Sequence, residues 1–187
     1  VSATADFTQP YWLRQPREGD RFTWPQGSAA TMPFDPPVLA THAEVDFGGA
    51  TIAMSRPAEF RRVDRMLGEQ RSLVKVVPPM SVHISPEFAV IPVGGTRRKE
   101  FTVTVENQNA AAVEGEVRLV TPVGWSVEPA SRLVKFSRHG EKVSVPFAVT
   151  ATSVVGDLPV QAVVKSGNQE FNQGYVEGAY PHIETRN

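Results

Sequence analysis

The sequence contains no cysteine among its 187 residues. This absence excludes disulfide bonds, thiolate zinc sites and cysteine nucleophiles. No apolar run approaches the roughly 20 residues that a membrane-spanning helix needs. The net charge is −1, from 19 basic and 20 acidic residues, so the chain has no overall field that would attract nucleic acid or anionic membranes. We therefore expect no nucleic-acid partner and no membrane insertion.

The start of the chain also lacks familiar features. The stretch VSATADFTQPYW has no initiator Met and neither the basic nor the apolar region of a signal peptide. We therefore expect the chain to be a piece of a longer protein. Its length fits one large domain or two small domains of roughly 80 to 110 residues.

Motifs of common catalytic sites are missing. Neither G-x-S-x-G nor the spacing of a phosphate-binding P-loop occurs. No two histidines lie three or four residues apart, which excludes a helical zinc pair such as H-E-x-x-H. We interpret each histidine as exposed or locally hydrogen-bonded. The four histidines are His42, His83, His139 and His182.

Carboxylate pairs offer little for acid–base catalysis. Glu114 and Glu116 share one face of a predicted strand, but that face is the solvated one. Asp64 is flanked by Arg62 and Arg65, which predicts a surface ion pair. Nothing in these patterns indicates the burial that would shift the pKa of a carboxyl group.

Proline and large apolar side chains are abundant in residues 1–37. Proline fixes its own backbone angle and restrains the preceding residue, so we expect an extended and irregular segment. A disordered linker rarely carries so many large apolar groups, so we expect the segment to be ordered and laid over a sheet, with room for one short strand. Its large apolar residues are Tyr11, Trp12, Leu13, Phe22, Trp24 and Phe34.

Strand patterns begin at residue 38. In VLATHAEVDFGGATIAMS, apolar residues alternate with polar ones, which is typical of a half-buried strand, and Gly48-Gly49 predicts a hairpin turn. A second pair of strands around a Gly68 turn is expected to run through Val77. Pro78-Pro79 ends this pattern and indicates a domain boundary near residue 79.

The remainder reads as at least seven short strands in about 100 residues, with turn signals every 8 to 12 residues or so. The strand patterns lie in the two parts of SVHISPEFAVIPVGG around Pro86, KEFTVTVEN, VEGEVRLVTP, GWSVEP, RLVKFS, EKVSVPFAVTA and the two halves of LPVQAVVKSGNQEFNQGYVE. The sequence thus predicts an all-β chain of two immunoglobulin-like antiparallel β-sandwich domains in tandem. The first covers residues 1–79, including the proline- and aromatic-rich leading segment, and the second covers residues 80–187.

Aromatic side chains are the remaining candidates for a binding site. Exposed Trp or Tyr rings can stack on sugars, and Tyr11, Trp12 and Trp24 lie in the irregular leading segment. We regard these three as candidate contacts to carbohydrate or to another domain, with packing as the more ordinary alternative. Trp125 begins a strand and is expected to fill the sandwich core.

Four blocks of sequence resemble two known families. PVGWSVEPASRLVKFSRHGEKVSVPFAVT is similar to the α-galactosidase-associated immunoglobulin-like domain, through Pro122, Gly124, Trp125, Val127 and Pro129 and then Gly140, Glu141, Val145, Phe147, Val149 and Thr150. QPYWLRQPREGDRFTWP, RPAEFRRVDRMLGEQRSLVKVVPPMSV and YPHIETR resemble the region after the catalytic domain in bacterial deacetylases of the PIG-L (LmbE-like) family.

That resemblance implies an accessory fragment of an exported, periplasmic or extracellular, N-acetylglucosamine de-N-acetylase. The catalytic A-H-P-D-D-E motif of the family, which binds zinc, has no counterpart here, so we expect no metal, cofactor or catalytic residue in this chain. The implied partner is an upstream catalytic domain of the same protein. Two other hypotheses are kept: a carbohydrate-binding module that directs the parent hydrolase to glycans, and an independent hydrolase.

Overall fold

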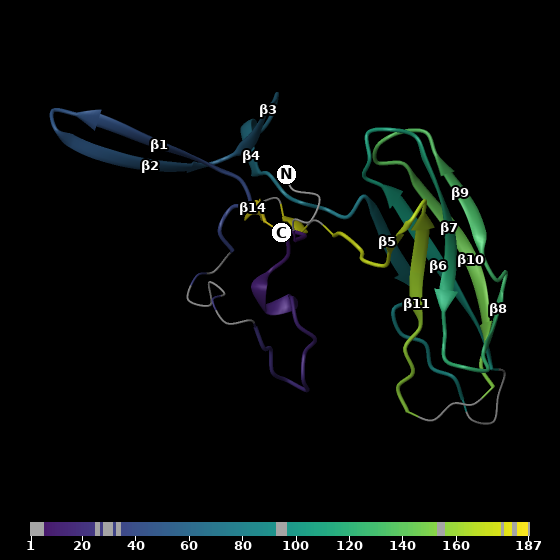
Figure 1. Cartoon of the computed structure of the whole chain (residues 1–187). Coiled ribbons are helices and arrows are strands. Elements are labelled where there is room, and N and C mark those ends of the chain that lie inside the picture. Colours follow the sequence, from purple (N-terminus) through teal and green to yellow (C-terminus); the bar gives the residue numbers. More distant parts are fainter. Residues whose placement is uncertain are drawn as a thin grey trace. The chain divides into compact units, whose positions relative to one another are not determined.

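The computed structural model describes residues 6–24, 27, 32, 35–92, 97–152, 156–176, 178–180 and 183–186 (Figure 1). The regular secondary structure of the described part consists of antiparallel strands, apart from the single 3-10 turn η1 (Tyr11–Leu13). The prediction of an all-β chain is confirmed.

Contacts divide the chain into two compact units. The first unit comprises Val1–Val76 together with Val176–Asn187, and the second unit is Val77–Tyr175. A compact unit is not the same as an independently folding domain. The sequence-based domains, residues 1–79 and 80–187, therefore stay predictions.

The second unit is a sandwich of two four-stranded antiparallel sheets (Figure 1). One sheet has the order β5-β6-β10-β8 and the other β12-β11-β7-β9. The strands are β5 (Met80–Ser85), β6 (Arg98–Asn107), β7 (Val113–Val120), β8 (Ser126–Glu128), β9 (Arg132–Phe136), β10 (Lys142–Thr150), β11 (Gln161–Ser166) and β12 (Gln169–Phe171).

The core of the second unit follows from period-2 alternation. In β6, Phe101, Val103 and Val105 are buried, and β10 pairs Val145 with Val103 and Phe147 with Phe101. Buried residues of β7, β9 and β11 complete the cluster from the opposite sheet. Trp125 packs against this core at its border. These predicted strands and their inward faces are confirmed, whereas the described residues 86–92 contain no strand.

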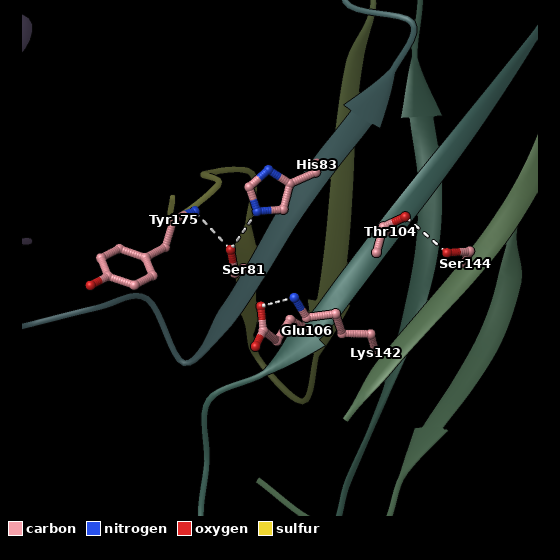
Figure 2. A network of polar contacts seen from close by, with 7 residues as sticks. All are labelled: Ser81, His83, Thr104, Glu106, Lys142, Ser144 and Tyr175. Carbon is pink, nitrogen blue, oxygen red and sulfur yellow. Dashed lines mark hydrogen bonds and ion pairs between the residues drawn. The ribbon is translucent and has the colours of Figure 1, made fainter. Parts of the chain in front are cut away.

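Cross-strand pairs of polar side chains cover the outer face of β6 and β10 (Figure 2). The Thr104 and Ser144 hydroxyls are 2.9 Å apart, and Lys142 Nζ lies 3.4 Å from a Glu106 carboxylate oxygen. Directly opposed polar pairs of this kind stabilise a sheet modestly. We assign these residues to the sheet rather than to a site.

In the first unit, the described strands form two-stranded sheets. β1 (Ala40–Phe47) pairs with β2 (Ala50–Pro57), β3 (Glu59–Asp64) with β4 (Gly68–Leu73), and β13 (Gly178–Tyr180) with β14 (Ile183–Arg186). The hairpin at Gly48-Gly49 is therefore confirmed. The predicted strand through Val77 ends earlier, at Leu73.

The predicted burial of one face of β1 is wrong for this structure. Val45 is 45% exposed and Phe47 is 78% exposed, although the apolar and polar faces alternate as the sequence indicates. The physical reason is that a two-stranded ribbon has no second layer of its own to cover its apolar face.

Asp64 was expected to form a surface ion pair, and it lies at the surface near Arg62, but its hydrogen bonds come from backbone groups of a turn. Its carboxylate accepts hydrogen bonds from the backbone N–H groups of Met66 (2.8 Å) and Leu67 (2.9 Å) in the turn between β3 and β4. These bonds lower the pKa of Asp64, with the bond from Leu67 as the largest cause. Asp64 is thus a cap of the hairpin turn.

Candidate ligand cavity and aromatic cluster

A cavity of about 350 Å³ lies within the first unit. Three extended segments line it: residues 6–10, continued by Trp12 and Arg14, residues 35–38 and residues 73–75. Cavities of this size fall at the lower end of the range, about 300 to 1,000 Å³, that holds small-molecule ligands. The cavity is therefore large enough for a small ligand.

Backbone hydrogen bonds bring the three segments together. Thr8 N–H donates to the Val76 carbonyl and Val76 N–H donates to Thr8 Oγ1, both at 2.8 Å. Ala58 N–H donates to the Leu39 carbonyl (2.9 Å), and Val74 N–H donates to the Ala58 carbonyl (3.3 Å). These bonds hold the bases of the two hairpins beside the leading segment. The cavity thus lies between chain segments that backbone hydrogen bonds link to one another.

The three aromatic residues singled out in the sequence lie together. The ring of Tyr11, which is 9% exposed, contacts Trp12 edge-on at 4.9 Å between ring centres and Trp24 at 5.8 Å. Such T-shaped contacts are favourable because the positive edge of one ring meets the negative face of another. Trp12 lines the cavity, whereas Trp24 and Tyr11 do not belong to its lining.

An ion pair supplies the polar part of the cavity lining. A guanidinium nitrogen of Arg14, Nη2, lies 3.4 Å from Asp35 Oδ2. That oxygen is buried and, among the residues that the structure describes, receives no hydrogen bond. Because solvent does not reach this oxygen, a ligand in the cavity can contact only the exposed parts of the Arg14 and Asp35 side chains, which are 35% and 21% exposed.

The charges of the lining cancel. Asp6 and Asp35 contribute two negative charges, and Arg14 and Lys75 contribute two positive charges. The cavity therefore has no net charge that would select an anion or a cation. Its lining can accept and donate hydrogen bonds next to the aromatic ring of Trp12.

The sequence patterns did not identify Arg14 and Asp35 as candidate site residues. They are separated by a stretch without regular periodicity, so no helix or strand pattern places them on a common face. The available signal was the presence of charged residues between prolines and aromatics in a segment expected to be ordered.

A Ser–His pair in the second unit resembles a nucleophile beside a base (Figure 2). Ser81 Oγ and His83 Nε2 are 3.1 Å apart on one face of β5. Ser81 is fully buried, and its Oγ also accepts the N–H of Tyr175 at 2.7 Å. The bond from Tyr175 N–H to Ser81 and the bond from Val82 N–H to the Gln173 carbonyl (2.9 Å) hold the chain after β12 against the edge strand β5. We therefore assign Ser81 a structural role.

The other predicted residues take ordinary positions. His42 is exposed, and the Nδ1 atom of His139 lies 3.0 Å from the Gln108 carbonyl oxygen. His182 lies outside the described residues. Glu114 pairs with Lys135 at 3.5 Å.

The described residues contain neither a metal-binding cluster nor a membrane-spanning helix. No group of three or more His, Cys, Asp or Glu residues there could hold a metal ion. No helix there is long and apolar enough to cross a membrane.

Comparisons with known proteins do not assign the chain to a family. No model of a known protein family matches the chain, and a search of curated proteins returns no match. The family resemblance therefore rests on the quoted sequence blocks alone.

Proposed function

We propose that this chain is a non-catalytic accessory region of a larger PIG-L-like N-acetylglucosamine de-N-acetylase, which packs against the catalytic domain and positions it. The second unit would be an immunoglobulin-like domain of the α-galactosidase-associated type, and the tandem arrangement of two such domains belongs to the same proposal. The sandwich with strand order β5-β6-β10-β8 over β12-β11-β7-β9 is compatible with that assignment. Export of the parent protein and a zinc ion in its catalytic domain are further parts of the proposal.

One observation supports the accessory role above others: the exposed apolar face of the β1–β2 hairpin. Val45 pairs with Ile52, and Phe47 lies at the end of the same face. Val45, Phe47, Ile52 and Met54 are each 45% exposed or more. A contiguous exposed apolar face marks a surface that another protein surface covers. A two-stranded hairpin is at best marginally stable in water by itself, so such a cover would also stabilise it.

Hydrogen exchange provides the test. We would compare the amides of β1 and β2 in this chain with those in a longer protein that carries the upstream catalytic domain. If the catalytic domain covers the hairpin, the amides of the hairpin become protected in the longer protein. Equal exchange in both proteins would contradict the proposal.

Two matched variants sharpen the test. Phe47→Ser changes the apolar face, whereas Glu44→Ser changes the opposite face of the same strand. Only Phe47→Ser should reduce the protection and the activity of the longer protein. A loss of similar size in both variants would indicate that the hairpin has unfolded rather than lost its contact.

The second candidate function is carbohydrate binding. The specific observation in its favour is the cavity lined by Trp12, Arg14 and Asp35 in the first unit. Binding of the chain to an array of glycans would test it, and binding to none of them would remove this candidate while leaving the accessory role intact.

A further inference from the structure

We propose that the cavity beside Trp12 binds a single neutral pyranose ring, held by hydrogen bonds to Arg14 and Asp35. This inference rests on the second candidate function and adds its site, its polar contacts and its ligand class. Of the three aromatic residues that the sequence offers as glycan contacts, only Trp12 touches the sugar in this proposal.

The hydrogen-bonding part of the lining comes from Arg14 and Asp35. Both residues line the cavity and their side chains are 35% and 21% exposed, although the Oδ2 atom of Asp35 itself is buried. A sugar hydroxyl both donates and accepts. One hydroxyl can therefore donate to Asp35 while it, or its neighbour on the ring, accepts an N–H of Arg14.

The apolar requirement comes from the rest of the lining. Trp12, Leu73 and Val74 lie among the prolines of the leading segment around the cavity. A pyranose ring has apolar C–H faces as well as hydroxyls, and such a face packs favourably on an aromatic ring. The edge-on contact at 4.9 Å with the buried Tyr11 restrains Trp12 before any ligand arrives, so little order has to be gained on binding.

Charge and size narrow the ligand class. The lining carries two carboxylates and two cationic side chains, so a charged ligand gains no net attraction. A cavity of about 350 Å³ is small for an oligosaccharide chain. A neutral sugar unit, such as the end of a chain, satisfies both conditions, and its binding should depend little on ionic strength.

Indole N–H resonances of the unaltered chain report on the site. The chain has three tryptophans, Trp12, Trp24 and Trp125, and replacing each by Phe assigns its signal. The probes are methyl glycosides of glucose, galactose, mannose and N-acetylglucosamine, with a disaccharide of each. We expect a saturable shift of the Trp12 signal, whereas the Trp125 signal, from the second unit, stays in place.

Three variants test the contacts. Asp35→Ala and Arg14→Ala each remove a partner of the hydroxyls and should weaken binding about ten- to hundredfold. Asp46→Ala is the matched control, because this carboxylate lies on the β1–β2 hairpin and pairs with Thr51 outside the cavity. The control should bind the probe like the unaltered chain.

Each outcome has a definite meaning. Saturable binding with a Trp12 shift, lost in Asp35→Ala and retained in Asp46→Ala, supports the cavity as the site. Binding that leaves Trp12 unshifted and survives Asp35→Ala overturns the site but keeps the carbohydrate function. Failure of all probes overturns the site, and the glycan array then decides separately whether the carbohydrate function stands.

Discussion

Single polar residues fix the loops of the sandwich, and Asn107 is the most constrained of them. Its side chain is fully buried, with Nδ2 donating to the carbonyls of Ala111 (3.3 Å) and Arg138 (3.0 Å). Its Oδ1 accepts the N–H of Asn109 at 2.9 Å. One side chain thus joins the loop after β6 to the loop before β10.

We predict that Asn107→Ala destabilises the second unit by about 2 to 4 kcal/mol, because several buried backbone groups lose their partner at once. Hydrogen exchange of the β6 and β7 amides measures the free energy of unfolding of this unit directly. Gln161→Ala, at an exposed position of β11, is the control and should change it by less than about 0.5 kcal/mol. A similar small change in Asn107→Ala would contradict the assigned role.

The hydrogen bonds of Glu141 should make the stability of the second unit depend on pH. Its carboxylate accepts the backbone N–H (2.6 Å) and the hydroxyl (2.8 Å) of Ser137, and these bonds lower its pKa below the usual 4.5. A pKa that is lower in the folded state adds stability above the unfolded-state pKa, and this stability is lost as the pH falls through the folded-state pKa.

We therefore expect Glu141→Gln to destabilise the second unit near neutral pH and to converge with the unaltered chain under acid conditions, below pH 4.5. Urea denaturation as a function of pH measures the difference. Glu100→Gln, on the exposed face of β6, is the control. A difference between Glu141→Gln and the unaltered chain that stays constant with pH would argue against the Ser137 contacts as its origin.

The sequence predicts the direction of side chains within a strand but not the contacts between irregular segments. The inward direction of Phe101 and Val117 follows from alternation within one strand, which the sequence contains in full. The approach of Arg14 to Asp35 depends on how an irregular, proline-rich segment folds back, which no local period encodes. The cavity could therefore not be predicted, although Trp12 beside it could be singled out as an aromatic in an ordered segment.

At the scale of elements, the β1–β2 hairpin depends on its two glycines. Phe47 pairs with Ala50, which leaves Gly48 and Gly49 as a two-residue loop with φ of 57° and 86°. Positive φ at both positions is the signature of a type I′ turn, whose twist matches that of the flanking strands.

We predict that Gly49→Val disrupts the hairpin, since a β-branched residue is strongly disfavoured at positive φ, whereas Gly48→Asn preserves it because Asn tolerates this conformation. Cross-strand nuclear Overhauser effects between Val45 and Ile52 report the pairing. Loss of these effects in both variants, or in neither, would be inconsistent with a type I′ turn.

The same hairpin separates what a strand pattern can and cannot predict. Alternation and the Gly-Gly turn identify the strands, the turn and the apolar face. They do not identify what covers that face, because burial depends on a second layer, which need not belong to the same segment. This is why β1 and β6 were both predictable as strands, while burial was predicted correctly for β6 and wrongly for β1.

At the scale of the whole molecule, the two units differ in how their apolar surface is covered. Every residue of the buried core cluster belongs to Val77–Tyr175, and both sheets of that unit contribute to it. The first unit presents exposed apolar side chains on its hairpins, such as Phe47 and Phe60. Burial of apolar area is the main favourable term in folding, so we expect most of the intrinsic stability in the second unit.

This difference predicts that residues 77–175, expressed alone, fold as they do in the whole chain. The fragment keeps the core and also the link from Ser81 to Tyr175 that fastens its last residues to β5. Its amide resonances for β6, β7, β10 and β11 should overlay those of the full chain, and those strands should exchange at similar rates.

Urea should unfold the full chain in two steps, with the amides of β1 and β2 exposed in the earlier one, because a hairpin with uncovered apolar faces has little to oppose chain entropy. A single cooperative transition, or a fragment with collapsed resonances, would show that the sandwich draws its stability from the first unit, and the accessory proposal would then have to treat the chain as one folding unit.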